Sequence, residues 1–280
     1  MSTPPIQWYP GHIAKAEKSL LEQLKKVDVV LEVRDARIPL ATHHPNVPQW
    51  VNTRGLVLVL NRMDMIPQPL QQEWMSWFAD RAEFPCLTDA QHGKGIESVK
   101  QAVQLAGAKV NERRVSRGML PRPIRAIVIG FPNVGKSALI NRLLNRRVVE
   151  SARRAGITRQ FRWVRISDQI ELLDAPGVLP NKLLDQEAAL KLAICDDIGE
   201  AAYDNQRVAA ALVDLLKQLG NDRPVHARYG IDPTAPTGES YLHLLADQNY
   251  QNDREKAARQ ILNDFRKGVL GPISLEFPPA

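Results

Sequence analysis

The sequence is poor in cysteine: it has only two in 280 residues, Cys86 and Cys195, and they lie far apart. Neither belongs to a Cys-x-x-Cys pair or to a nearby set of histidine and cysteine ligands. This usage argues against a structural zinc site and against a disulfide framework. No apolar run approaches the ~18 residues of a membrane-spanning helix, and the N-terminus lacks the pattern of a signal peptide. We therefore expect a soluble, cytoplasmic protein with no membrane partner.

Acidic residues are scarce in one long segment. Residues 109–165 contain fifteen basic residues and only two acids, Glu112 and Glu150, in a chain of net charge +6. A solvated basic surface would explain this segment, but the clustering favours a polyanionic partner such as nucleic acid. Apolar residues make up 44% of the chain, which suits one large or two modest domains.

Apolar runs that alternate with helical patterns predict an α/β fold with a mainly parallel sheet. We expect strands at residues 27–33, 56–60, 84–88, 125–129, 160–166 and 170–173. Helices are expected at residues 13–26, 73–80, 96–108 and 137–144. Residues 109–123 are polar and end in prolines, so we interpret them as a surface connection.

The chain changes character after Gly177, beyond which no convincing strand pattern occurs. An apolar stripe predicts a helix that ends near Gly220. Asn252 is expected to cap a last long helix with an apolar inner face. We therefore expect two domains, an α/β domain over 1–178 and an all-α domain over 179–280.

The segment Gly130–Ser137 reads Gly-Phe-Pro-Asn-Val-Gly-Lys-Ser and matches a phosphate-binding P-loop between a strand and a helix. Its glycines let the backbone wrap around phosphates, with N–H groups directed at the anion. Lys136 is expected to neutralise the β- and γ-phosphates, and the Ser137 hydroxyl to ligate Mg²⁺. An ordinary glycine-bearing turn is the weaker alternative. The residues expected to contact nucleotide here are Asn133, Val134, Gly135, Lys136, Ser137 and Ala138.

A candidate guanine-binding segment lies upstream of the P-loop, at the end of a predicted strand. It consists of Asn61, Arg62, Met63 and Asp64. A carboxylate at Asp64 can accept from guanine N1–H and from the exocyclic amine, a donor pair that adenine lacks, so it would select GTP and GDP. A polar turn is the alternative in isolation, and an ATP-dependent P-loop enzyme is a further one. After the next strand, backbone N–H groups at Asp89 and Ala90 are expected to reach guanine O6.

Two features downstream of the P-loop complete the predicted site. Asp174-Ala-Pro-Gly177 follows a strand, where Asp174 is expected to hold Mg²⁺ through water and the Gly177 N–H to sense the γ-phosphate. Thr158 lies in the loop between the P-loop helix and the next strand, where a hydroxyl would reach Mg²⁺ when the γ-phosphate is present. A surface threonine in a basic loop is the alternative for Thr158.

The glutamine that often orients the attacking water after Asp-x-x-Gly is missing, because Val178 occupies that position. His12, presented by the turn at Pro10-Gly11, is one candidate replacement, although a histidine packed against Trp8 fits the sequence as well. The side-chain oxygen of Asn133 is a candidate ligand for a monovalent cation.

Taken together, these motifs resemble the ribosome biogenesis GTPase A family, a branch of the circularly permuted GTPases, and the resemblance spans nearly the whole chain. Besides the guanine-binding segment and the P-loop, it is carried by Trp8-Tyr-Pro-Gly-His12-Ile-Ala-Lys15, Asp35-Ala-Arg-Ile-Pro39, Gly156-Ile-Thr158 and Asp174-Ala-Pro-Gly177. It implies a P-loop GTPase domain in the permuted motif order G4-G5-G1-G2-G3, followed by a helical C-terminal domain.

The resemblance implies a GTP-hydrolysing factor for late assembly of the large (50S) ribosomal subunit, with hydrolysis stimulated by that subunit. It also implies a role for His12 in hydrolysis beside Lys136 and Thr158, and potassium dependence through Asn133. Three features depart from the family pattern: Arg62 replaces the usual lysine, Ala155 replaces a proline, and Thr88-Asp89-Ala90 matches the fifth motif only loosely.

The resemblance further implies that the C-terminal domain contacts rRNA, and a monomer is expected. The candidate RNA-binding residues are Arg254, Lys256, Arg259, Arg266 and Lys267, on the outer face of the last helix. An exposed charged helix face without a partner is the alternative. We expect the GTP form to bind the pre-subunit and rRNA or ribosomal proteins, and hydrolysis to release it. The competing interpretation is an RNA-binding assembly scaffold in which the nucleotide is a structural or slow-switch ligand.

Overall fold

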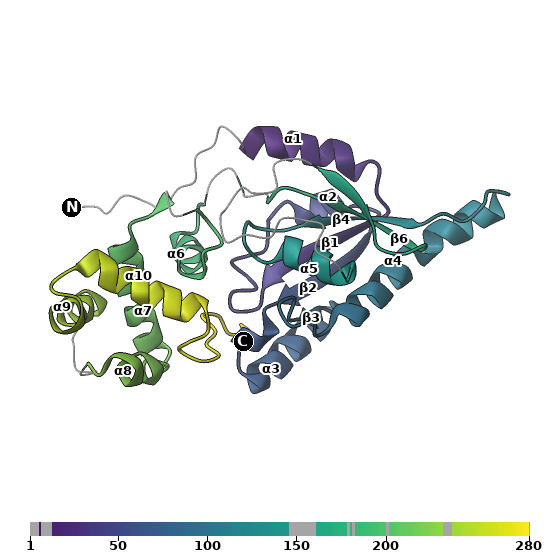
Figure 1. The fold of residues 1–280 in the computed structure, drawn as a ribbon. Coiled ribbons are helices and arrows are strands. Elements are labelled where there is room, and N and C mark those ends of the chain that lie inside the picture. Colours follow the sequence, from purple (N-terminus) through teal and green to yellow (C-terminus); the bar gives the residue numbers. More distant parts are fainter. Residues whose placement is uncertain are drawn as a thin grey trace.

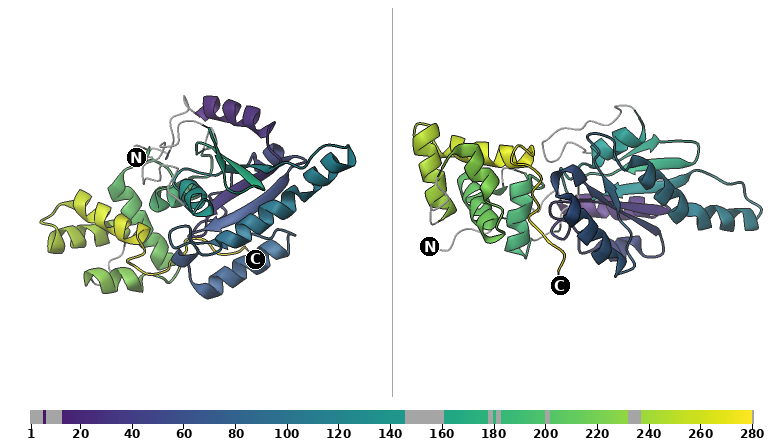
Figure 2. Two further views of the ribbon diagram at one scale, coloured as in Figure 1. Left: turned by 45° about the vertical axis from the view of Figure 1, so that its right-hand side comes forward. Right: turned by 90° about the horizontal axis from the view of Figure 1, so that it is seen from below.

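The computed structural model describes residues 6, 13–145, 161–177, 180, 183–199, 202–231 and 237–279. Within these residues, a part built around a six-stranded sheet is followed by an all-helical part (Figure 1). Seen from below, the two parts lie side by side, and the C-terminal tail runs along their boundary (Figure 2). The predicted domain boundary between positions 178 and 179 falls outside the described residues.

The sheet has the strand order β3-β2-β1-β4-β6-β5. Its strands are β1 (Val29–Asp35), β2 (Gly55–Asn61), β3 (Cys86–Thr88), β4 (Ile124–Ile129), β5 (Arg162–Arg165) and β6 (Ile170–Asp174). All neighbouring strands are parallel except β5 and β6. The predicted α/β fold with a mainly parallel sheet is thereby confirmed.

Both faces of the sheet are covered by helices, which explains why its strands read as apolar runs. The helices of this part are α1 (Ile13–Leu24), α2 (Val47–Val51), α3 (Gln68–Ala79), α4 (Ile96–Ser116) and α5 (Lys136–Leu143). Successive β1 residues alternate between faces. Leu31 packs in one cluster with Val99 of α4 and Leu139 of α5, whereas Val30 packs in another with Leu20 of α1 and Trp50 of α2.

Helix α4 is the largest departure from the predicted elements. It was expected to end at residue 108 but continues to Ser116, so residues 109–116 are helical and not a surface connection. Gly107 is its last buried residue, and beyond it the helix projects from the body of the molecule (Figure 1). The projecting end packs on no sheet and therefore has no apolar stripe that would reveal it, although its lysine, glutamate and arginine residues favour helix.

Smaller differences also have local causes. Strand β1 ends at Asp35 and not at residue 33, because its last two residues are charged yet buried in ion pairs. Helix α3 begins at Gln68, before the predicted start at residue 73, with a proline in its first turn, where no backbone N–H is needed. The short helix α2 was not predicted.

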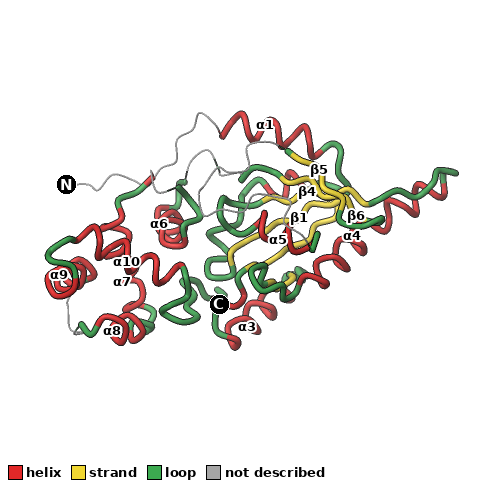
Figure 3. Tube along the Cα trace, viewed as in Figure 1, coloured by secondary structure: helices red, strands yellow, loops and turns green. Residues whose placement is uncertain are grey.

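In the rest of the described chain all regular elements are helices, and Figure 3 shows all strands confined to the first part. Its helices are α6 (Gln186–Cys195), α7 (Asn205–Gln218), α8 (Arg223–Tyr229), α9 (Gly238–Asn249) and α10 (Arg254–Arg266). The predicted apolar stripe lies on α7, which buries Val208, Leu212 and Leu216. The predicted cap of the last helix was wrong by one position: Asp253, not Asn252, accepts the bond from the Lys256 N–H. Among the described helices, none is long and apolar enough to cross a membrane.

Candidate nucleotide-binding site

The residues predicted to bind nucleotide gather at the carboxyl edge of the parallel strands. Asn61 ends β2, Thr88 ends β3 and Asp174 ends β6, while Gly130 directly follows β4. Ligands of parallel α/β sheets bind at this edge, outside the ends of the strands. The guanine-binding segment and the P-loop, which are far apart in the sequence, therefore meet at one site.

Asn61 joins the guanine-binding segment to the P-loop. Its buried side-chain Nδ2 donates to the Val134 carbonyl at 2.9 Å. Its Oδ1 accepts from the Thr88 hydroxyl and the Ala90 N–H, each at 3.1 Å. This approach requires glycine at position 135, since a Cβ there would lie 2.1 Å from Asn61 Nδ2 and the φ angle is 101°. The side-chain amide of Asn61 thus fixes both the P-loop and the loop after β3.

Arg62, at the position where the family pattern has lysine, also contacts the P-loop. Its Nη2 donates to the carbonyl of Asn133, and its Nη1 lies 3.0 Å from the Asp35 carboxylate. The forked guanidinium makes both contacts at once, which a single ammonium group is less suited to do. Arg62 therefore links the guanine-binding segment to the P-loop.

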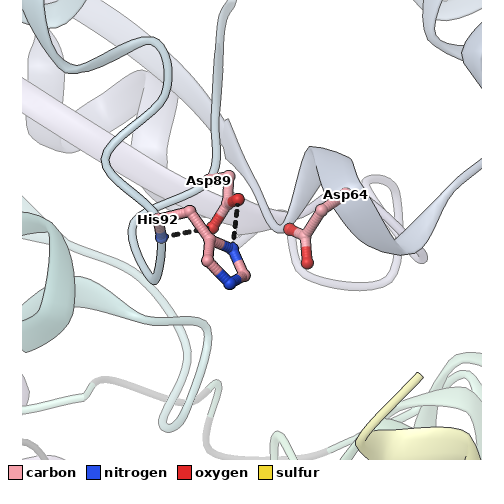
Figure 4. Close-up of side chains that lie close together, drawn as sticks. All are labelled: Asp64, Asp89 and His92. Atoms are coloured by element: carbon pink, nitrogen blue, oxygen red, sulfur yellow. Dashed lines mark hydrogen bonds and ion pairs between the residues drawn. The ribbon is translucent and has the colours of Figure 1, made fainter. Parts of the chain in front are cut away.

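Asp64 stands opposite a carboxylate–imidazole pair formed by Asp89 and His92 (Figure 4). The ligand atoms of these three residues lie within 4.8 Å of one another. Asp89 already accepts from the Gln91 and His92 N–H groups and contacts His92 Nδ1 at 2.7 Å. With Asp89 satisfied in this way, the cluster fits a base-recognition site better than a metal site. Partial burial and the charge of Asp89 raise the pKa of the exposed Asp64.

The loop after β3 differs from its prediction in one respect. The N–H groups of Asp89 and Ala90, expected to reach guanine O6, donate instead to the Lys94 carbonyl and to Asn61 Oδ1. Arg142 of α5 also donates to the Ala90 carbonyl at 3.0 Å. In the structure, these residues fix Asn61 and the shape of the loop.

Lys136 is buried at the start of α5, where its Nζ donates to the carbonyls of Gly130 (3.1 Å) and Phe131 (2.6 Å). Burial lowers the pKa of Lys136 to about 8, although the nearby carboxyl groups of Asp174 and Asp197 oppose this shift. Phosphate oxygens would offer this ammonium stronger, charge-assisted bonds than neutral carbonyls do. The geometry is therefore that of a P-loop lysine held near the phosphate-binding backbone.

Of the residues expected to hold Mg²⁺, Asp174 and Ser137 are among the described residues. Asp174 is 1% exposed, and its Oδ1 has no hydrogen-bond partner among the described residues. Burial raises the pKa of Asp174 to about 6, and Lys136 counteracts part of the rise. Together with the Ser137 hydroxyl, this carboxylate offers the oxygen ligands that Mg²⁺ prefers. Gly177 lies against the P-loop, because a Cβ there would be 2.9 Å from the backbone of Pro132.

Several predicted residues lie outside the described residues, namely His12, Thr158, Ala155 and Val178. Asn133 is described, and its Nδ2 donates to the Asp196 carbonyl, just beyond α6, at 2.6 Å. The P-loop thereby contacts the helical part, whereas the potassium site at Asn133 stays a prediction.

The predicted basic face of α10 is only partly present. Its exposed members are Arg254, Lys256, Arg259 and Lys267. Arg266 is different: it is half-buried and donates to the carbonyls of Ala193 and Ile194 and to the Tyr203 hydroxyl. Arg266 therefore ties α10 to α6 and does not belong to the exposed face, a correction that the helical pattern alone could not supply.

Known proteins with similar sequences and structures show the family of the chain. A sequence profile described as 50S ribosome-binding GTPase matches residues 125–227, beginning in β4 just before the P-loop. Proteins named ribosome biogenesis GTPase A from Bacillus cereus and Priestia megaterium are 32% and 36% identical to the chain. Each match covers 98% of this chain, and 94% and 97% of those proteins, respectively.

The fold is also shared with a solved structure, the GNP-bound YlqF of T. maritima. The two match with a TM-score of 0.64 at 22% identity, over 94% of this chain and 98% of the other. The P-loop, the guanine-binding segment upstream of it and the near-complete coverage of these relatives assign GTP hydrolysis to the chain. The chain therefore belongs to the ribosome biogenesis GTPase A family, and it is a GTPase.

Proposed function

We propose that this GTPase assists late maturation of the large (50S) ribosomal subunit in the cytoplasm, acting as a monomer. The GTP form binds the pre-subunit through rRNA and ribosomal proteins, and hydrolysis releases it. The observation that carries the proposal is the pair of bonds from Asn61 and Arg62 to the P-loop, which join two distant segments of the chain at one edge of the sheet. The names of the relatives supply the ribosomal context.

In the proposed site, Asp64 reads the guanine base and Lys136 neutralises phosphate charge. Asp174, Ser137 and Thr158 would hold Mg²⁺, which would supply positive charge to the phosphates during hydrolysis. His12 orients the attacking water, because Val178 has no group able to do so. A potassium ion at Asn133 would add positive charge at the same place.

The surface proposed to contact RNA has two basic regions. One is the exposed face of α10, which carries Arg254, Lys256, Arg259 and Lys267. The other is the projecting end of α4, where Lys109, Arg113 and Arg117 are exposed. Both regions lie outside the sheet edge that forms the nucleotide site, so RNA and nucleotide can bind together.

Sedimentation with precursors of the large subunit tests the proposal. The protein should co-sediment with a non-hydrolysable GTP analogue and remain in the supernatant with GDP. Lys136→Ala should lose both nucleotide-dependent binding and turnover, whereas Lys25→Ala removes a lysine whose described contact is a surface pair with Glu22 and should change neither. Equal binding with both nucleotides would contradict the switch.

A scaffold with a structural nucleotide is the second candidate, favoured by the valine at position 178. Turnover measured with and without large subunits separates the two functions. An assembly GTPase is stimulated strongly by the subunit, and His12→Ala removes the stimulation. A scaffold shows the same slow turnover in every case.

A further inference from the structure

Two buried charges in the segment Asp35–Pro39 have no role of their own in the proposed function above. Asp35 and Arg37 are both 0% exposed and form an ion pair at 2.7 Å. Burying an ion pair contributes little to stability compared with apolar residues of similar size, because both charges lose their hydration. The contacts of these two side chains therefore point to a role other than stability.

On one side, Asp35 reaches the guanine-binding segment. Parallel pairing of β1 with β2 sets Asp35 opposite Asn61, and the Ala36 N–H donates to the Asn61 carbonyl at 2.8 Å. The Asp35 carboxylate lies 3.0 Å from Arg62 Nη1, while Arg62 Nη2 donates to the P-loop carbonyl of Asn133. Asp35 thus holds the arginine that holds the P-loop.

On the other side, the same carboxylate reaches the helical part through Arg37. Arg37 Nη2 donates to the Cys195 carbonyl at the end of α6, at 3.2 Å. Its guanidinium lies 5.3 Å from the ring centre of Phe265 in α10, and its carbonyl accepts from the Leu275 N–H of the C-terminal tail. One carboxylate is therefore shared by an arginine of the nucleotide site and an arginine packed against three helical-part segments.

The charges around Asp35 favour its ionised form. Burial alone would raise the pKa of Asp35, but Arg37 and Arg62 together hold it below its usual value, so Asp35 is an anion. Asp197 is also fully buried, and burial followed by the charge of Asp35 raises its pKa well above the usual value. The Asp35 carboxylate lies 2.7 Å from Arg37 and 3.0 Å from Arg62, so the two arginines share it.

We propose that Asp35 is a positioning residue for guanine nucleotide, acting through Arg62, and that through Arg37 it couples nucleotide binding to the docking of the helical part. This inference rests on the proposed base-binding role of the segment Asn61–Asp64. Coupling of this kind is reciprocal: nucleotide that orders Arg62 strengthens the contact of Arg37 with α6, and docking of the helical part strengthens nucleotide binding.

A double-mutant cycle tests the positioning role, with the affinity for a fluorescent GDP analogue as the readout. Asp35→Asn should weaken binding by about tenfold, the size expected for loss of one charge-assisted hydrogen bond. In an Arg62→Ala background, the same change should weaken binding by less than about twofold, because Asp35 acts through Arg62. If the two substitutions instead weakened binding independently, so that their fold changes in affinity multiplied in the double variant, the positioning role would be overturned.

Glu32→Gln is the matched control. Glu32 is a fully buried carboxylate on the same strand, paired with Arg34 at 2.7 Å and His43 at 2.8 Å. Its loss should lower the melting temperature as Asp35→Asn does, yet leave the GDP affinity of the folded protein unchanged. An equal loss of affinity in Glu32→Gln would reduce the Asp35 effect to general destabilisation and overturn the proposal.

Hydrogen exchange tests the coupling to the helical part. GDP should slow amide exchange at residues 193–197 in the wild type and in Glu32→Gln, but not in Asp35→Asn or Arg62→Ala. Arg62→Ala keeps the Asp35–Arg37 pair and removes a side chain that is 27% exposed. This variant therefore tests the coupling even if Asp35→Asn does not fold. GDP-dependent protection that persists in Arg62→Ala would overturn the coupling. Failure of the wild type to prefer guanine nucleotides would instead overturn the proposed site itself.

Discussion

Replacing Asp64 with asparagine should change the base preference of the site from guanine to xanthine. The carboxylate can accept from both guanine N1–H and the exocyclic amine, whereas an asparagine side chain presents one acceptor and one donor. Xanthine carries a carbonyl where guanine carries the amine, so the asparagine donor gains a partner. The change conserves volume and removes one exposed charge beside Asp89, which should leave the fold intact.

The size of the effect follows from the bonds lost. A hydrogen bond to a charged group contributes about 1.5–3 kcal/mol. The asparagine keeps one acceptor, so one of the two bonds is lost outright, and because Asp64 is exposed we take the lower limit for it. A loss of ~1.5 kcal/mol corresponds to an affinity for GDP roughly tenfold weaker. XDP should bind the variant more tightly than it binds the wild type.

Competition of GDP, XDP and ADP against a fluorescent GDP analogue measures these affinities. Asp80→Asn, an exposed aspartate at the end of α3, is the matched control and should leave all three unchanged. If Asp64→Asn bound GDP as tightly as the wild type, the assignment of base recognition to this segment would be refuted.

Three further predictions concern pH, salt and stability. Because the pKa of Asp64 is raised by burial and by Asp89, GDP affinity should fall as pH drops through that raised value, and titration of Asp64→Asn should lack this component. Replacing Arg254 and Lys256 with glutamine should lower the slope of log affinity for rRNA against log salt by about 1.4–1.8 if each contacts one phosphate; an unchanged slope would contradict RNA contact by α10. Asp253→Ala removes the N-cap bond of α10 and should cost about 1 kcal/mol in urea unfolding, whereas the neighbouring Asn252→Ala should not.

The parts of the fold that depend on local pattern were predictable. The buried strands and the P-loop show themselves in apolar runs and in glycines at fixed spacing, and the structure contains them at nearly the expected positions. The projecting end of α4 was missed because an unpacked helix needs no apolar stripe. The cap of α10 was missed by one residue because Asn252 and Asp253 are both good caps.

The connections of the site could not be predicted from spacing alone. Asp35 meets Arg62 only because β1 pairs in parallel with β2 at a particular register, and register is set by the folded sheet. Arg266 sits at a polar helical position, and only the placement of α6 shows that it faces Ala193 and not solvent. The sequence did contain a signal for Asp35 and Arg37, namely a charged stretch directly after an apolar strand, but not their partners.

A structure of the complex with GDP and Mg²⁺ would show whether the two distant segments bind one guanine nucleotide. We expect the base to lie against the segment Asn61–Asp64, with both oxygens of Asp64 within hydrogen-bonding distance of guanine nitrogens. The phosphates should lie on the backbone of residues 133–138, with Lys136 turned from its own loop carbonyls toward phosphate oxygen. Phosphates on that backbone with the base directed away from Asp64 would contradict this expectation.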